Sequence, residues 1–189
     1  MADHFEKIEP IHREFILRQK VFFNASAAAE GRVNVSPRDV ASLRVLSDNR
    51  VAYLDLTGSG NETAAHLRAN GRLTLMFCSY EGAPLILRLY GQGRILRRGS
   101  DEYRQLLAVE FDGYEPPGSR QIVQLQVERV QTSCGYNVPQ FDYRQNRDAL
   151  RRWSEAKGPE GLEQYRREKN ALSIDGLPTG MFDEEEPLR

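Results

Sequence analysis

The chain has 189 residues, with 26 Lys and Arg residues against 27 Asp and Glu residues and a formal net charge of −1. This length suits a single domain with at most a short appendage, and a chain of this size buries about 70% of its unfolded surface without needing a disulfide or a metal. The near-neutral balance argues against nucleic acid or an anionic membrane as the main partner, because proteins that bind them carry a net basic domain or patch.

Apolar periodicity predicts a helix over residues 10–20, followed by several short alternating segments. These segments predict strands over residues 21–26, 32–36, 42–46 and 50–56. Pro37 is expected to end the second strand, because proline has no N–H for a β-ladder. Short strands at this spacing indicate a barrel or a sandwich.

The middle of the chain predicts two helices among longer strands. Asn61 is expected to cap a short helix that stops at Gly71, and Ser100 caps another that runs to about residue 110. Strands are predicted over residues 72–80, 85–97 and 121–132. Gly91 and Gly93 lie inside one of them, where glycine marks the bulge or bend that a small barrel needs to close.

The C-terminal part predicts two charged helices, over residues 147–157 and 161–172, separated by Gly158 and Pro159. We interpret them as a helical hairpin packed on the barrel through Trp153 and Tyr165. The expected organisation is a barrel domain over residues 1–140, a helical extension over 141–180 and a frayed acidic tail over 181–189.

A loop over residues 54–63 has the layout of an anion site. A strand, a glycine-bearing turn and a helix start can aim backbone N–H groups at a phosphate, and Thr57, Ser59 and Thr63 add hydroxyls. The pattern is neither a Gly-Lys-Ser/Thr phosphate loop nor a three-glycine dinucleotide fingerprint. A plain connection is the alternative, and Glu62 favours it because a carboxylate competes with a bound anion.

Two further groups of polar residues interrupt apolar strands. Asn34, Ser36 and Arg38 have the same parity, so a regular strand points all three to one face, which is either solvent-exposed or a binding surface. Arg88 lies among apolar neighbours and is either directed outward or paired with an anion inside. Arginine supplies 22 of the 26 basic residues, an excess that suits carboxylate or phosphate recognition but that genomic base composition also explains.

No catalytic residue or metal site is assigned. Cys134 as a nucleophile would need a general base, and none of His4, His12 or His66 is near it in sequence; a structural cysteine is the alternative. Two distant cysteines, no visible signal peptide and no apolar run of membrane-spanning length lead us to expect a soluble cytoplasmic protein with reduced thiols.

Several segments together resemble the pyridoxamine 5'-phosphate oxidase-like family, whose fold is the FMN-binding split barrel. They are Asn-Val-Ser-Pro-Arg, Leu-Asp-Leu-Thr-Gly-Ser-Gly-Asn-Glu-Thr with its Ala-His-Leu helix, and Ile-Leu-Arg-Leu-Tyr-Gly, within residues 15–137. The resemblance implies a mainly β, Greek-key split barrel with peripheral helices, and a homodimer that holds FMN between its subunits. The cofactor-binding residues that it implies are Asn34, Ser36, Arg38, Thr57, Ser59, Asn61, Glu62, Thr63 and Arg88, with Cys134 and Tyr136 reaching the cofactor from the partner subunit.

The sequence departs from the biosynthetic oxidase at three places. Glu62 and Thr63 stand where the oxidase has an Arg-Lys pair, Val33 replaces an arginine, and the terminal Trp-and-Arg substrate segment is missing. The resemblance therefore implies an FMN oxidoreductase acting on an unknown small substrate, not necessarily pyridoxamine 5'-phosphate. The alternatives are a non-catalytic module that binds a flavin, a deazaflavin or a haem-type ligand, and an interaction protein that uses its C-terminal helices.

Overall fold

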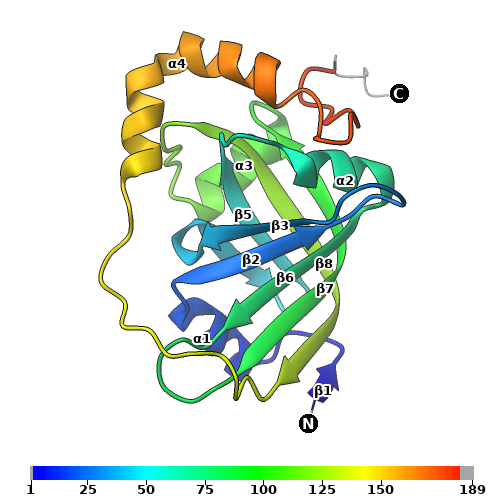
Figure 1. The fold of residues 1–189 in the computed structure, drawn as a ribbon, viewed down its shortest axis with the longest axis vertical. Coiled ribbons are helices and arrows are strands. Elements are labelled where there is room, and N and C mark those ends of the chain that lie inside the picture. Colours follow the sequence, from blue (N-terminus) through cyan, green and yellow to red (C-terminus); the bar gives the residue numbers. More distant parts are fainter. Residues whose placement is uncertain (1, 184–189) are drawn as a thin grey trace.

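The computed structural model describes residues 2–183, which form one curled antiparallel sheet with helices around it (Figure 1). Segments in which apolar and polar residues alternate form strands, and segments with apolar residues at helical spacing form helices. The elements in chain order are β1 Ala2–Phe5, α1 Pro10–Arg18, β2 Val21–Ser26, β3 Asn34–Asp39, a short 3-10 turn Val40–Ser42, β4 Leu43–Ser47, β5 Arg50–Leu56, α2 Glu62–Asn70, β6 Arg72–Cys78, β7 Ile86–Arg97, α3 Asp101–Glu110, β8 Ser119–Ser133 and α4 Ala149–Lys169.

The strand order in the sheet is β3-β2-β6-β7-β8-β5-β4, and every pairing is antiparallel. The long β8 pairs with β7 on one side; on the other side its first half pairs with β5 and its second half with β1. Strands β3 and β4 are therefore the two ends of the path.

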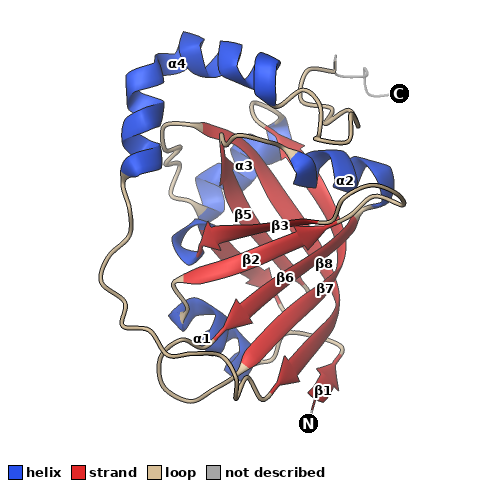
Figure 2. Ribbon diagram, in the orientation of Figure 1, coloured by secondary structure: helices blue, strands red, loops and turns tan. Residues whose placement is uncertain are grey.

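The sheet curls until distant strands touch. Phe22 of β2 and Tyr53 of β5 are separated in the sheet order by three strands, yet their ring centroids lie 5.3 Å apart. One apolar core fills the curl, with contributions from strands β2 and β4 to β8. The mainly β split barrel that the sequence predicted is thereby confirmed, as the red strands of Figure 2 show.

The helices close the openings of this barrel. Helix α1 lies at one end, α2 at the other, and α3 covers a second apolar cluster on the outer face of the sheet (Figure 1). Asn61 precedes α2, and Gly71 ends it in the left-handed conformation (φ 73°), where its N–H donates to the Leu67 carbonyl. The Ser100 hydroxyl accepts from the Tyr103 N–H and caps α3, so the predicted bounds of both helices are confirmed. No helix among residues 2–183 is both long enough and apolar enough to cross a membrane.

Two strand predictions need correction. β3 does not stop before Pro37 but continues to Asp39, with Pro37 directly opposite Phe23. β3 ends the sheet and has no neighbour on its outer side, so a missing N–H there breaks no ladder bond. Strand β1 was not predicted, because its four residues are too few to show an apolar alternation.

The bulge predicted at the strand glycines is present. The β7–β8 register shifts between Tyr90 and Gly91, and a Cβ added to Gly91 would lie 2.0 Å from the backbone oxygen of Gln126. Only glycine allows the two backbones to approach this closely.

The C-terminal helices join into α4, which bends at Gly158 (φ 65°) where the sequence predicted a break. Trp153 and Tyr165 contact each other across the bend, with ring centroids 5.0 Å apart, but both are only half-buried. The residues that α4 buries are instead Ser154, Leu162 and Arg166. Of the expected acidic tail, residues 181–183 lie against the protein, whereas residues 184–189 lie outside the described residues.

Candidate functional site

A cavity of about 920 Å³ opens beside the start of α2. One side of it is β3, the floor is the loop between β5 and α2, and the segment after α4 forms the other side. Three stretches that are far apart in sequence thus meet at one end of the barrel. Two of them are the segments that the sequence singled out as anion-binding candidates.

The three polar residues of β3 share one face, as their parity predicted, and this face lies beside the cavity. Asn34, Ser36 and Arg38 are half-buried, while the residues that alternate with them are exposed. Ser36 Oγ donates to Asn34 Oδ1 at 3.1 Å, and Asn34 Nδ2 donates to the hydroxyl of Thr63 at 3.2 Å. The two candidate segments are therefore in direct contact, and the face is not simply solvent-exposed.

Thr63 has a hydroxyl whose direction is largely determined by its partners. Its Oγ1 accepts from Asn34 and also from buried Asn24, whose Nδ2 lies 2.7 Å away. A hydroxyl has one proton and two lone pairs, so these contacts leave the O–H of Thr63 as a donor for a third partner. This O–H and the N–H groups of the first turn of α2 are donors that could bind an anion.

The remaining loop residues divide into two groups. Ser59 is exposed and lines the cavity. Thr57 and Asn61, both predicted to bind the cofactor, are buried in other contacts: Thr57 Oγ1 donates to the Gly118 carbonyl at 2.8 Å, and Asn61 Oδ1 accepts from Gln121 at 2.8 Å. The structure therefore assigns them to holding the loop and not to lining the cavity.

A buried carboxylate lies under the cavity between two arginines. Asp55 Oδ1 is 3.1 Å from Arg38, and Asp55 Oδ2 is 2.7 Å from Arg120 Nε and 2.8 Å from Gln121 Nε2. Burial by itself would raise the pKa of Asp55, but the charges of Arg120 and Arg38 outweigh it and lower that pKa below its usual value. Two guanidinium groups thus share one carboxylate beneath the cavity, and the carboxylate of Glu62 lines the cavity itself.

His66 also faces the cavity, although the sequence suggested only a packing role. Its Nδ1 lies 3.0 Å from Ser26 Oγ, and its Nε2 is buried with no hydrogen-bond partner among the described residues. The sequence signal was its position three residues after Thr63, which places both on one helix face. Arg120 was missed as well, because its role depends on contacts between strands.

The segment after α4 closes one side of the cavity. Both carboxylate oxygens of Glu62 accept from the N–H of Ile174, at 3.1 and 3.0 Å. Asp175 pairs with Arg32, whose backbone N–H also donates to it at 2.7 Å. Glu62 thus anchors this segment, a role that the sequence did not indicate.

Three predicted residues lie away from the cavity of their own chain. Arg88 on β7 projects to the face opposite its buried neighbours Leu87 and Leu89, and it donates to Ser133 Oγ at 3.2 Å. Cys134 and Tyr136 are exposed in the loop after β8. Their expected approach to a cofactor from the partner subunit stays a prediction. Within residues 2–183, no group of three or more His, Cys, Asp or Glu side chains could hold a metal.

Comparisons with known proteins point to one family. A family model described as pyridoxamine 5'-phosphate oxidase matches residues 8–134. The pyridoxamine 5'-phosphate oxidase family protein ustO of Aspergillus flavus is 38% identical over 195 residues, which cover 94% of this chain and 78% of that protein.

Two solved structures have a similar fold. A variant of HupZ from group A Streptococcus superposes with a TM-score of 0.53 at 21% identity, over 67% of this chain and 99% of that chain. A protein from Lactobacillus delbrueckii, provisionally assigned as a pyridoxamine 5'-phosphate oxidase, gives a TM-score of 0.51 at 19% identity, over 67% and 94%. Both likenesses concern the fold.

Proposed function

Because the chain belongs to the pyridoxamine 5'-phosphate oxidase family, we propose that it is an FMN-binding oxidoreductase whose cofactor phosphate lies between β3 and the start of α2. The observation that carries this proposal is the convergence of Ser36, Arg38, Ser59 and Thr63 on one cavity above a carboxylate shared by two arginines. Phosphate oxygens accept from hydroxyl and guanidinium donors, which these residues supply.

The residues present fit the phosphate end of the cofactor. Thr63 has a hydroxyl donor directed by its two acceptor contacts, and the Nε of Arg38 is buried with no hydrogen-bond partner among the described residues. A buried donor without a partner is costly, and a bound oxygen relieves that cost. Glu62 accepts from Ile174 and so directs its carboxylate toward the closing segment.

FMN, when bound, supplies the transfer of hydride or electrons to and from a small substrate. The residues of the chain bind and orient the cofactor. Ser36, Arg38, Ser59 and Thr63 hold the anionic end, and the segment from Lys169 to Ile174 shields one side from water. The Nε2 of His66, beside the cavity, is buried without a hydrogen-bond partner among the described residues.

Replacing Arg38 by alanine tests the phosphate assignment. We expect FMN affinity to fall about 10- to 100-fold, since a hydrogen bond to a charged group contributes about 1.5–3 kcal/mol. Riboflavin has the same ring without the phosphate, so its affinity should change little. Fluorescence titration of both ligands measures the difference. Arg50→Ala, at the exposed beginning of β5, is the matched control.

Equal losses for FMN and riboflavin would mean that Arg38 supports the fold or the ring and not the phosphate. Ser59→Ala gives a second measurement without a folding cost, because the side chain is exposed and has no hydrogen bond to the described residues. It should weaken FMN binding about 3- to 10-fold, as expected for one hydrogen bond of about 0.5–1.5 kcal/mol.

We also propose that a second copy of the chain covers the mouth of the cavity, which places the cofactor at a subunit interface. Four apolar residues around the mouth are exposed in the single chain: Val33 by 70%, Val35 by 59%, Leu172 by 56% and Ile174 by 70%. Apolar side chains gathered around a polar cavity are typical of a surface that another protein covers.

Val35→Glu is expected to raise the dimer dissociation constant at least about 10-fold, because an unpaired carboxylate would be buried at the interface. Ile11→Glu is the control, since Ile11 is equally exposed (67%) but lies on α1 at the other end of the barrel. Sedimentation velocity measures both variants. A wild-type chain that binds FMN as a monomer would disprove the shared site.

A ligand-binding role without turnover is the second candidate. It is favoured because the arginines near the cavity are mostly engaged by carboxylates: Arg38 and Arg120 by Asp55, and Arg32 by Asp175. Such a protein would hold a flavin, a deazaflavin or a haem-type ligand. Reduction of the bound flavin by NAD(P)H supports the oxidoreductase, whereas a stable oxidised complex supports the second candidate.

A further inference from the structure

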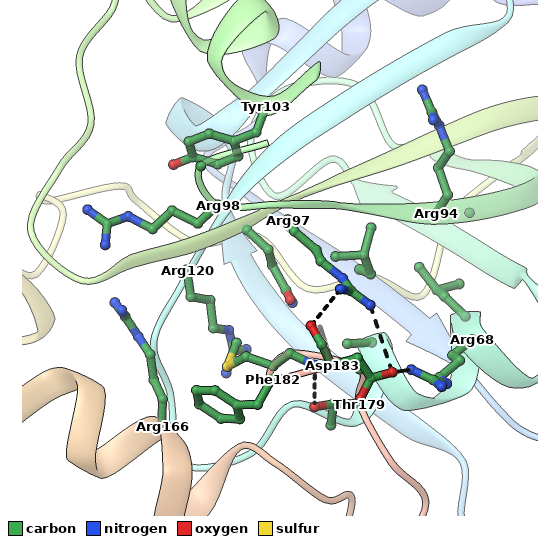
Figure 3. A pocket seen from close by; sticks show the side chains of 18 of the residues that line it. Arg68, Arg94, Arg97, Arg98, Tyr103, Arg120, Arg166, Thr179, Phe182 and Asp183 are labelled. Carbon is green, nitrogen blue, oxygen red and sulfur yellow. Dashed lines mark hydrogen bonds and ion pairs between the residues drawn. The ribbon is translucent and has the colours of Figure 1, made fainter. Parts of the chain in front are cut away.

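A second cavity, of about 780 Å³, lies on the other side of α2 from the candidate cofactor site. Between α2, β7, α3 and residues 179–183 it collects guanidinium groups from five different segments (Figure 3). Seven arginines and three carboxylates line it. The arginines are Arg68, Arg94, Arg97, Arg98, Arg104, Arg120 and Arg166, and the carboxylates are Glu115, Glu163 and Asp183.

One end of the cavity already binds a carboxylate of the chain itself. Asp183 pairs with Arg68, its Oδ2 lies 3.8 Å from Arg97, and its backbone carbonyl accepts from Arg97 NH1 at 3.0 Å. Figure 3 shows the two arginines reaching Asp183 from different elements. Two guanidinium groups on one carboxylate form a recognition pair for an anionic group.

The other end holds a buried cation without a matching anion. Arg166 donates to the Thr57 hydroxyl at 2.8 Å and to the Ser119 carbonyl at 2.9 Å, both neutral groups. Among residues 2–183, no carboxylate oxygen lies within 4.0 Å of it, whereas Arg98 is bound by Glu115. Burial and the charge of Arg98 lower the pKa of Arg166, and the more distant carboxylates of Glu163 and Glu115 offset this only in part. An additional anion in direct contact would stabilise the positive charge of Arg166.

We propose that this cavity binds a small organic diphosphate, whose linked phosphate groups displace Asp183 from Arg68 and Arg97 and extend toward Arg166. With Asp183 displaced, three guanidinium groups lack a carboxylate, and two phosphates carry about three to four negative charges. The volume suits a small molecule and not only an ion. Leu67, Ile95, Leu107 and Phe182 supply apolar contact for its body.

The test uses inorganic pyrophosphate as the probe and isothermal titration calorimetry of the full chain. Arg97→Gln should weaken pyrophosphate binding at least 10-fold, and Arg97 is exposed enough for the variant to fold. Asp183→Asn should tighten binding about 3- to 10-fold, because the competing carboxylate is gone. A chain that ends after Phe182 removes Asp183 together with the three glutamates that follow it in sequence, and it should tighten binding at least as much.

Two controls separate this cavity from the cofactor site and from general charge effects. Arg152→Gln removes an exposed arginine of α4 and should leave pyrophosphate affinity unchanged. Ser59→Ala, in the cofactor cavity, should also leave it unchanged, although the same variant weakens FMN. Pyrophosphate binding that depends on Ser59 and not on Arg97 would overturn the inference, as would an absence of binding to both the wild type and the truncated chain.

Discussion

Replacing Asp55 by asparagine is expected to lower the free energy of unfolding by about 3–5 kcal/mol, the cost of breaking a buried ion pair by removing one partner. Its carboxylate is 2% exposed and bonded to Arg38, Arg120 and Gln121. Asparagine fits the same space, but it leaves two guanidinium groups near the core without a counter-charge. Urea unfolding at neutral pH measures the loss.

The stabilisation by Asp55 is expected to depend on pH, in a direction that follows from its pKa. The two arginines hold the pKa of Asp55 in the folded protein below the value of about 3.9 expected in the unfolded chain. The stabilising contribution of the charge is therefore complete above about pH 4 and is lost as the pH falls through the folded-state pKa. The difference between wild type and Asp55→Asn should shrink in that acidic range.

Asp148→Asn is the control for this measurement, since Asp148 pairs with Arg152 on the exposed surface of α4. A pair of that kind contributes less than about 1 kcal/mol. If Asp55→Asn unfolded at the same urea concentration as wild type, the buried charge would not be holding β3 against β5.

Gly91→Ala is expected to destabilise the protein by about 3 kcal/mol, at the upper end of the usual cost of overpacking. The added methyl would meet the backbone oxygen of Gln126 at 2.0 Å and the backbone nitrogen of Glu128 at 3.0 Å. These are main-chain atoms of the neighbouring β8, so the clash cannot be relieved by a rotamer change. Instead, the two longest strands of the sheet must separate locally.

Gly58→Ala provides a matched comparison, because a Cβ at Gly58 meets no atom within 4 Å and its φ is not in the left-handed region. Thermal unfolding of the two variants should differ by several degrees or more. Equal melting temperatures would show that the bulge at Gly91 does not require glycine.

The strands of the barrel other than β1 could be predicted from sequence because each of them carries its own alternation. Leu87 and Leu89 of β7 are buried while Arg88 between them is not, so a local pattern was sufficient. The continuation of β3 through Pro37 could not be predicted, because it depends on β3 being at the end of the sheet. That position is set by the pairing of the whole chain.

The candidate site was only partly predictable for a similar reason. Parity placed Asn34 and Ser36 on one face, but the loop after β5 carried three hydroxyls with no local signal of direction. Thr57 turns toward Arg166, which lies 109 residues further along the chain, whereas Ser59 and Thr63 turn toward the cavity. Contacts with residues far away in the sequence therefore decide which of the three hydroxyls faces the cavity.

Pro37, opposite Phe23 at the outer end of the sheet, also affects how copies of the chain can associate. A free strand edge is a row of unused donors and acceptors on which another molecule can continue the sheet. The prolyl ring removes a donor from the middle of that row, so a continuous intermolecular ladder along β3 is interrupted. Extension of the sheet from one copy of the chain to the next along β3 is thereby disfavoured.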